Sequence, residues 1–224
     1  MNHSDGVFES IPTRFPRPYL YQKLKLKDHP DLLEEFDLLV DEATTMAHPK
    51  AIFRSATIQS RGNDFIEIDG HRLNSTLLAS QLVTSDSIYL VAATCGEELE
   101  QWAAQIKDPL KQYWIHVVLG IALERAMRYL RQHLNSIYHP GHLSVIEPGA
   151  NKYWSLEGQD VLFKLLGDLP EKIGLSLNPG YIMQPSKSIS GVMFPTNKVI
   201  NRCRLCDSET CFERTRQFDA SLFL

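Results

Sequence analysis

The chain has 224 residues, of which 43% are hydrophobic and 22% are charged, a composition typical of an ordinary folded protein with one substantial core. Its formal net charge of −4 argues against a nucleic-acid-binding or anionic-membrane protein, since both depend on a large basic surplus. The sequence shows neither an apolar segment long enough to span a membrane nor a signal-peptide pattern, so we expect a cytoplasmic protein.

In chain order, the sequence predicts three segments. Residues 1–28 are rich in proline, which opposes regular helix, and are predicted to form an extended arm that lies on the body. Residues 29–200 alternate helical and strand patterns and are interpreted as one domain. Residues 201–224 form a tail that contains three of the four cysteines.

Hydrophobic periodicity predicts the main elements of the domain. An amphipathic helix begins near Asp31 and ends before Pro49, and the longest helix runs from Leu110 to His133. The apolar run from Ser87 to Ala93 is typical of a central, buried strand. Strands or a hairpin are expected at 51–59 and 65–68. Two short helices are expected, one capped by Asn74 or Ser75 and one that ends at Gly167. Residues 138–149 are expected to form an irregular binding loop or a mobile flap.

Two residues in these elements are candidates for a functional role. Glu124 falls on or beside the apolar stripe of the longest helix, where an unpaired charge would be costly. An ion pair with Arg128, one turn later, and a contact with a ligand are both compatible with this spacing. Cys95 follows the buried strand and is interpreted as a structural thiol rather than a nucleophile, because no histidine lies near it in sequence.

The stretch from Pro185 to Gly191 reads PSKSISG and is the clearest candidate for a ligand-binding strand. In an extended conformation, its three serines share one face while Lys187 and Ile189 share the other. A polar edge of this kind can hold a polar ligand, although a solvent-exposed edge strand has the same pattern. Pro185 fixes the entry to the strand, and Gly191 permits a close backbone approach or a bulge.

The tail carries a C-x2-C-x4-C motif made of Cys203, Cys206 and Cys211. This spacing allows three thiolates to hold a metal. Zinc would normally take a fourth ligand, whereas an iron-sulfur cluster can leave one iron open, and the spacing does not distinguish the two. Free thiols and a disulfide between Cys203 and Cys206 are the alternatives. The candidates for a fourth ligand are Cys95, His139 and His142.

Residues 183–194 read MQPSKSISGVMF, and residues 92–100 read AATCGEELE. The first segment resembles M-x-P-x-x-S-V-S-G-x-x-F of the activation domain of cobalamin-dependent methionine synthase. The second resembles the turn A-A-T-x-G-x-x-L-E of short, stand-alone relatives of that domain. Residues 108–126 resemble the family's long helix, with Glu124 at its glutamate, and residues 148–163 resemble S-P-G-Y-G-x-W-P-L-E-x-Q-x-x-L-F. The resemblance spans about residues 30–211 in a shared order.

The resemblance implies an α+β fold, in which helices pack on a twisted, mainly antiparallel sheet. In the family, this domain binds S-adenosylmethionine beside the oxidised cobalt of cobalamin and permits its reductive methylation, with electrons from a flavodoxin or similar donor. By this resemblance, Glu124 meets the positively charged part of S-adenosylmethionine. The residues expected to bind or shape the pocket of this ligand are Glu124, Gly149, Met183, Pro185, Ser186, Lys187, Ser188, Ser190 and Gly191.

The leading hypothesis is therefore a stand-alone accessory protein that reactivates a cobalamin-dependent methyltransferase or other corrinoid protein in trans. In this hypothesis, the cysteine cluster passes electrons to the partner. One alternative is a non-catalytic binding module, in which zinc holds the C-terminus and the ligand pocket is vestigial. Another is an unrelated enzyme that uses Cys95 as its nucleophile.

Overall fold

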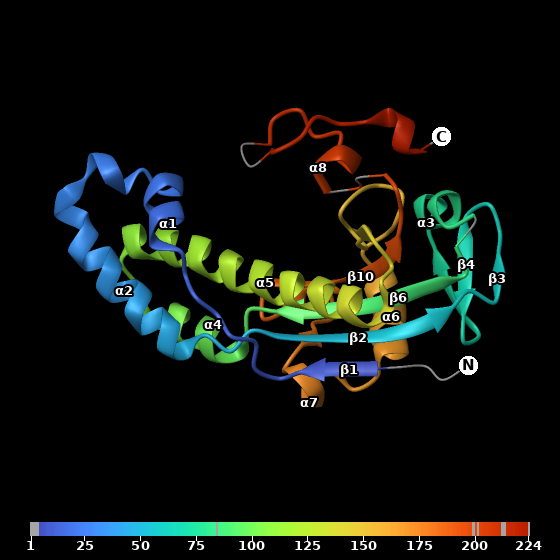
Figure 1. Cartoon of the computed structure of the whole chain (residues 1–224), viewed down its shortest axis with the longest axis horizontal. Helices are drawn as coiled ribbons and strands as arrows, with labels where there is room; N and C mark the ends of the chain where they lie inside the picture. The colour runs from blue at the N-terminus through green and yellow to red at the C-terminus, as the bar shows by residue number, and fades with distance from the viewer. Residues whose placement is uncertain (1–4, 84, 199, 201, 212–213, 224) are drawn as a thin grey trace.

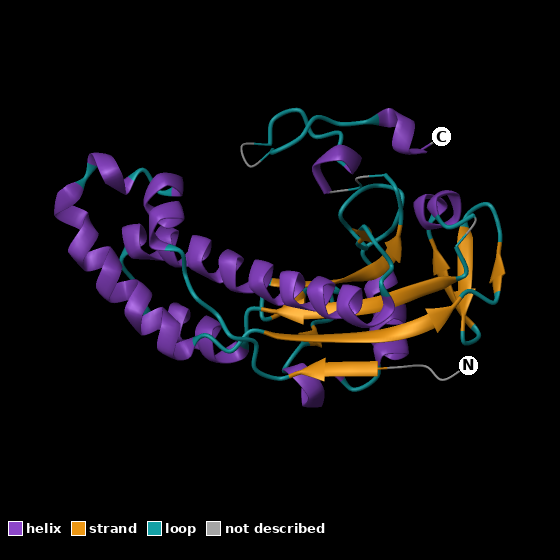
Figure 2. Cartoon of the chain, viewed as in Figure 1, coloured by secondary structure: helices purple, strands orange, loops and turns teal. Residues whose placement is uncertain are grey.

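The computed structural model describes residues 5–83, 85–198, 200, 202–211 and 214–223. Its centre is a five-stranded antiparallel sheet with the order β1-β2-β6-β10-β7, and helices lie on both sides of it (Figures 1 and 2). The expected α+β fold class is thereby confirmed. The strands of this sheet are β1 (Asp5–Phe8), β2 (Lys50–Thr57), β6 (Ser87–Thr94), β7 (Leu143–Ile146) and β10 (Ser188–Pro195).

The other elements surround this sheet. No helix of the described residues is both long and apolar enough to cross a membrane. The helices are α1 (Arg17–Lys23), α2 (Leu33–Met46), α3 (Thr76–Gln81), α4 (Glu97–Gln105), α5 (Pro109–Tyr138), α6 (Gly158–Leu166), α7 (Leu169–Ile173) and α8 (Arg202–Leu205), with short 3-10 turns at Leu26–Asp28, Pro30–Leu32 and Ala220–Phe223. Two smaller sheets contain β3 (Ser60–Arg61), β4 (Phe65–Ile68) and β5 (His71–Asn74), and β8 (Ser176–Leu177) and β9 (Met183–Gln184).

The central sheet is buried on both faces because its strands carry apolar residues at successive positions. Phe53, Val91 and Met193 point to the face that α5 covers, where they pack with Leu130. Their neighbours in sequence point to the opposite face, as the pleat of a strand requires. There Ile52, Leu90 and Val192 pack with α3, α6 and the β3-β4-β5 sheet.

A helical lobe extends beyond the ends of the strands (Figure 1). It is formed by α1, α2, α4 and the first half of α5, which bury an apolar cluster of their own. Phe36 of α2 and Trp114 of α5 meet edge to face in this cluster, with ring centroids 5.3 Å apart. The long helix α5 therefore belongs to both parts, since its first half supports the lobe and its second half covers the sheet.

The N-terminal residues are more regular than the sequence predicts. Residues 5–8 add a strand to the edge of the sheet, and helix α1 begins directly after Pro16, with Pro18 in its first turn. Proline is tolerated there because the first N–H groups of a helix have no partner within it. The density of prolines thus marks the start of a helix in this segment. The predicted division of the chain at residues 28 and 200 stays a prediction.

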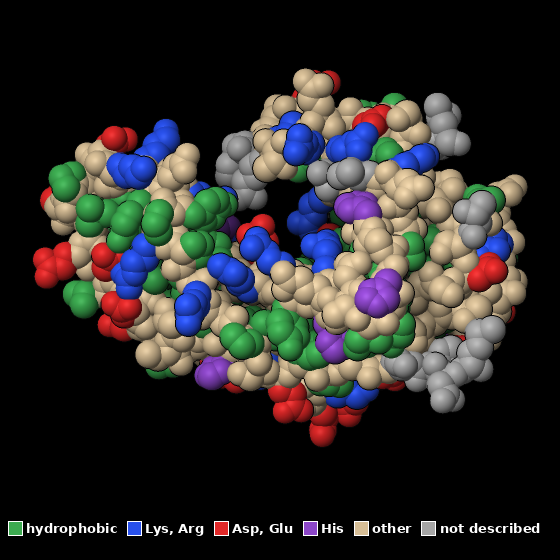
Figure 3. Space-filling view, in the orientation of Figure 1, with side chains coloured by type: hydrophobic (Ala, Val, Ile, Leu, Met, Phe, Trp, Pro, Cys, Tyr) green, Lys and Arg blue, Asp and Glu red, His purple; other side chains and the backbone are tan. Residues whose placement is uncertain are grey.

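The C-terminal tail packs on the body through a few anchors. Leu205 and Leu222 are buried in the main apolar cluster, and Gln81 of α3 donates a hydrogen bond to the carbonyl oxygen of Leu222 over 2.5 Å. Arg204 forms an ion pair with Asp219 within the tail. These contacts hold α8 above the second half of α5, across a hollow from the helical lobe (Figures 1 and 3).

Candidate functional site

A cavity of about 560 Å³ lies between α5 and the β7–β10 edge of the sheet. Helix α5 packs mainly against β2 and β6, so its second half leaves the outer strands partly uncovered. Glu124, Ser186, Lys187 and Ser188, which the sequence predicts as ligand contacts, line this cavity together. The other lining residues are Gly120, Leu123, Met127 and Arg131 of α5, Val145 and Glu147 of the β7 region, Ile189, Ile200 and Arg202.

A second cavity of about 350 Å³ adjoins the first. Gly149, Met183 and Ser190 line it, so the predicted contacts are divided between two spaces. Both cavities are lined by Glu147 and Arg202, which form an ion pair with each other. This ion pair therefore forms part of the wall that the two cavities share. The predicted contacts Pro185 and Gly191 line neither cavity.

Glu124 is exposed, and this differs from the costly, core-facing position that its spacing indicates. Its carboxylate forms no ion pair or hydrogen bond with any residue in the described part of the chain, Arg128 included. Glu124 also borders a third hollow of about 320 Å³, together with Tyr19 of α1 and Arg125 and Arg128 of α5. Of the two explanations that the sequence leaves open, the ion pair with Arg128 is not formed.

The predicted three-serine face is not formed, because only the second and third serines belong to the strand. Before β10 begins, Glu100 of α4 accepts hydrogen bonds from both the N–H and the hydroxyl of Ser186, the first over 2.6 Å. The hydroxyl of Ser188 donates to the carbonyl oxygen of Pro185 over 2.7 Å, and that of Ser190 donates to Gln159 over 3.3 Å. These hydroxyls shape the loop and strand rather than point unpaired into a cavity.

Lys187 and two glycines fix the backbone around the cavities. The Nζ atom of Lys187 lies 3.0 Å from Nε2 of His116, which ties the loop before β10 to helix α5. A Cβ atom at Gly191 would lie 2.5 Å from the carbonyl oxygen of Ile146, so only glycine permits this close approach of β7. The sequence predicts a close backbone approach or a bulge at Gly191 but does not identify its neighbour. Gly149 adopts a φ of +73°, a conformation that glycine tolerates best.

Three cationic and two acidic side chains line the first cavity. Arg131, Lys187 and Arg202 line it, and Figure 3 shows Lys and Arg side chains gathered in the hollow between the helical lobe and the tail. Burial lowers the pKa of Arg131, while the carboxylates of Glu147 and Glu124 act in the opposite direction. Glu147 raises the pKa of Arg202 through their charge interaction. No local sequence pattern links Arg131 or Arg202 to the serine stretch, so the sequence alone does not predict that they line this cavity.

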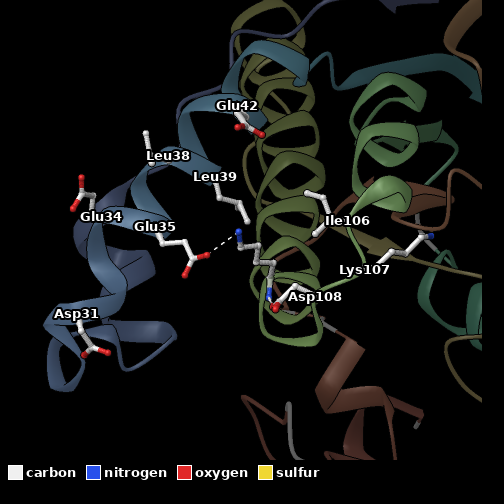
Figure 4. A pocket seen from close by; sticks show the side chains of 10 residues that line it. Asp31, Glu34, Glu35, Leu38, Leu39, Glu42, Ile106, Lys107 and Asp108 are labelled. Atoms are coloured by element: carbon white, nitrogen blue, oxygen red, sulfur yellow. Dashed lines mark hydrogen bonds and ion pairs between the residues drawn. The ribbon is translucent and has the colours of Figure 1, made fainter.

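A larger hollow of about 670 Å³ has the opposite charge (Figure 4). It lies between α2 and the start of α5, where Lys111 forms an ion pair with Glu35 over 2.8 Å. None of the residues predicted to bind a ligand lines it. The acidic residues that line it are Asp31, Glu34, Glu35, Glu42 and Asp108, and its basic residues are Lys107 and Lys111.

The tail cysteines do not form a metal site in the described residues. No group of three or more His, Cys, Asp or Glu side chains there is arranged to hold a metal ion, and all four cysteines are free thiols. The Sγ atom of Cys203 instead accepts hydrogen bonds from the N–H and hydroxyl of Thr215, over 3.5 and 3.4 Å. Arg214 donates to the carbonyl oxygens of Cys203 and Cys206. These contacts give no support to zinc or an iron-sulfur cluster, and the metal site stays a prediction.

The fold has a counterpart among solved structures. No family model matches the chain, and no curated protein matches it in sequence. The chain is similar in structure to the MetH reactivation domain, whose crystal structure was determined bound to AdoHcy. The TM-score is 0.62 at 17% sequence identity, over 89% of this chain and 81% of that chain. The chain therefore has the fold of a reactivation domain.

Proposed function

We propose that this protein is a reactivation-type protein that binds S-adenosylmethionine in the cavity beside α5 and acts in trans on a cobalamin-dependent methyltransferase or other corrinoid protein. One observation carries this proposal. Glu124 and the loop 186–188, which are far apart in the sequence, line one cavity of about 560 Å³. That volume is in the range of small-molecule sites. The structural similarity to a reactivation domain bound to AdoHcy supports the same ligand class.

The role of this chain in such a reaction is to bind and orient. The sulfonium of S-adenosylmethionine supplies the methyl group, and the cobalt belongs to the partner's cofactor. Glu124 is an exposed carboxylate at the cavity, where it can attract the sulfonium cation. Glu100 and His116 hold the loop 186–188 in place, so this wall of the cavity is fixed before the ligand arrives.

The ligand assignment is tested by titration calorimetry with S-adenosylmethionine and with AdoHcy (S-adenosylhomocysteine), which lacks the positive charge on sulfur. We expect both to bind, and we expect Glu124→Gln to weaken S-adenosylmethionine about tenfold, or about 1.4 kcal/mol, and AdoHcy much less. Glu42→Gln, in the acidic hollow, is the matched control and changes neither affinity. Binding of neither ligand to the unaltered protein would contradict the assignment.

The activity itself is tested with a separate corrinoid methyltransferase that contains inactive cob(II)alamin. With reduced flavodoxin and S-adenosylmethionine, we expect this protein to accelerate formation of methylcobalamin, followed by its absorbance, together with one AdoHcy per cobalt. The Glu124→Gln variant tests whether the rate depends on the proposed site. A rate that is the same with and without this protein would argue against a role in reactivation.

The cysteine tail enters the proposal as an electron-transfer site, with a zinc-held binding module as the alternative. Metal analysis after anaerobic purification distinguishes them. Iron with absorbance near 400 nm that bleaches on reduction supports electron transfer, and one zinc per chain supports the binding module. A metal-free protein with four reactive thiols after unfolding would argue against both, and it would agree with the hydrogen bonds that Cys203 accepts from Thr215.

A further inference from the structure

Charge is distributed unevenly over the hollows of this protein. The whole chain has a net charge of −4, and the hollow between α2 and α5 is lined mainly by carboxylates. The two hollows that meet at Glu124 have a surplus of positive charge, since five cationic side chains and two carboxylates line them in the described structure. Such a surplus in a concave site raises the local concentration of anions. The cations are Arg125, Arg128, Arg131, Lys187 and Arg202.

Arg131 lines the larger of these two hollows without a direct hydrogen-bond or ion-pair partner among the described residues, although the carboxylates of Glu147 and Glu124 are near enough to affect its pKa. Arg202 is paired with Glu147, and Lys187 contacts His116. The guanidinium of Arg131 forms no ion pair or hydrogen bond with any described residue, although its side chain is partly buried at the cavity. A guanidinium removed from water without a fixed acceptor is costly. A ligand in the cavity is the acceptor that would offset this cost.

We propose that Arg131, together with Lys187 and Arg202, forms an oxyanion subsite for a carboxylate or a phosphate group. The planar guanidinium can donate two parallel hydrogen bonds to such a group. Leu123, Met127 and Ile189 make the adjoining wall apolar, which limits water and strengthens charge interactions there. The three cations come from α5, the loop before β10 and the tail, so the subsite depends on the tertiary fold.

The identity of the molecule that carries the oxyanion rests on the proposed function. One source is the carboxylate of S-adenosylmethionine, and the other is the nucleotide phosphate of the partner's cobalamin. The three cations form the same oxyanion subsite whichever of these two molecules supplies the oxyanion. It can therefore be tested with a simple anion before the biological ligand is known.

The first experiment measures thermal stability in inorganic phosphate and in sodium chloride of the same ionic strength. We expect phosphate to raise the Tm of the unaltered protein, and we expect this rise to disappear in Arg131→Gln and to shrink in Lys187→Gln. Arg61→Gln is the matched control, because Arg61 pairs with Asp86 near the three-stranded sheet. Arg131→Met, which keeps the apolar stem, serves if the glutamine variant folds poorly. A phosphate-dependent rise that is equal in all variants, or no rise in the unaltered protein, would overturn the subsite.

The second experiment identifies the source. If the carboxylate is bound, AdoHcy binds at least tenfold more tightly than its analogue without the carboxylate, and Arg131→Gln removes this difference. If the phosphate is bound, the complex with a corrinoid protein loses affinity when cobinamide, which lacks the nucleotide phosphate, replaces cobalamin. If Arg131→Gln changes neither comparison, the subsite has no role in binding these ligands and the inference is wrong. Phosphate binding through Arg131 without any binding of S-adenosylmethionine would instead refute the proposed ligand and leave the subsite standing.

Discussion

Cys95 lies at the end of β6, beneath the loop that precedes β10. Its side chain is fully buried, and its N–H donates to the carbonyl oxygen of Lys187 over 2.9 Å. Burial raises the pKa of this thiol to about 12, and the nearby Glu100 adds to the effect. A thiol in this environment stays protonated at neutral pH and is a poor nucleophile. The enzyme hypothesis that uses Cys95 therefore has no support from its surroundings.

The first prediction concerns the reactivity of Cys95. In the folded protein at pH 8, we expect an alkylating reagent to modify the exposed Cys211 and to leave Cys95 unmodified until the protein is unfolded. Mass spectrometry of the digested protein checks which thiols carry the label. Rapid alkylation of Cys95 under native conditions would contradict the buried environment.

The same burial makes stability depend on pH. Because the pKa of Cys95 is raised in the folded state, its contribution to stability is fully present below the ordinary thiol pKa of about 9 and is lost as pH rises toward about 12. Burial also raises the pKa of Tyr89, so the useful quantity is the difference between the unaltered protein and Cys95→Ala. We expect urea unfolding to show this difference shrinking above pH 9.

At the scale of single residues, the sequence predicts some of the residues that line the cavity and misses others. Glu124 and Lys187 are predicted as ligand contacts from the family resemblance of their segments, and both line the cavity beside α5. Arg131 and Arg202 lie far apart in the sequence, and the packing of the tail above α5 brings them to one cavity. Glu100 fixes Ser186, and nothing in the sequence links this acidic residue at the end of segment 92–100 to the serine stretch.

Among the elements, α5 contributes most to the site, and it contains a glycine that packing does not require. A Cβ atom at Gly120 would meet nothing within 4 Å, although glycine within a helix costs about 1 kcal/mol relative to alanine. Gly120 lines the cavity beside α5. The missing side chain therefore leaves the cavity wider at some cost to the helix.

The second prediction separates these two effects. We expect Gly120→Ala to raise the free energy of unfolding by about 0.5–1 kcal/mol, because the helix gains rigidity without a clash. We expect Gly120→Leu to fold as well as the alanine variant and to bind S-adenosylmethionine or phosphate more weakly, because its side chain occupies the cavity. Urea unfolding and titration calorimetry measure the two quantities. Unchanged binding in Gly120→Leu would show that the ligand does not use this part of the cavity.

The elements that periodicity predicts well are those that bury a full face. Helices α2 and α5 and the central strand β6 agree with their predicted ranges, because each carries a continuous apolar pattern. Strand β7, residues 143–146, lies within a segment that the sequence predicts as an irregular loop. It is short, it lies at the sheet edge, and β10 is its only partner among the described strands. Its four residues therefore show too little alternation to predict a strand.

At the scale of the whole molecule, the C-terminal tail links the core to the cavity. Leu205 and Leu222 pack in the main apolar cluster, while Arg202, at the start of the same helix as Leu205, lines both cavities. The position of Arg202 therefore depends on how firmly the tail is held. The sequence predicts a separate cysteine segment here and gives no sign of this packing, because two leucines in an irregular stretch form no periodic pattern.

The third prediction tests whether the tail is part of the cooperative fold. Leu205 is 3% exposed, so Leu205→Ala should lower the free energy of unfolding by about 2–5 kcal/mol if the tail unfolds together with the core. Arg202→Gln removes a partly solvent-exposed ion pair and should change stability by less than about 1 kcal/mol while weakening phosphate binding. Both variants change helix α8, Leu205→Ala through its packing and Arg202→Gln through its charge.

If Leu205→Ala leaves global unfolding unchanged and instead increases hydrogen exchange only in residues 202–223, the tail opens independently of the core. In that case the cavity wall that contains Arg202 would open with it, and ligand affinity would fall in Leu205→Ala as well as in Arg202→Gln.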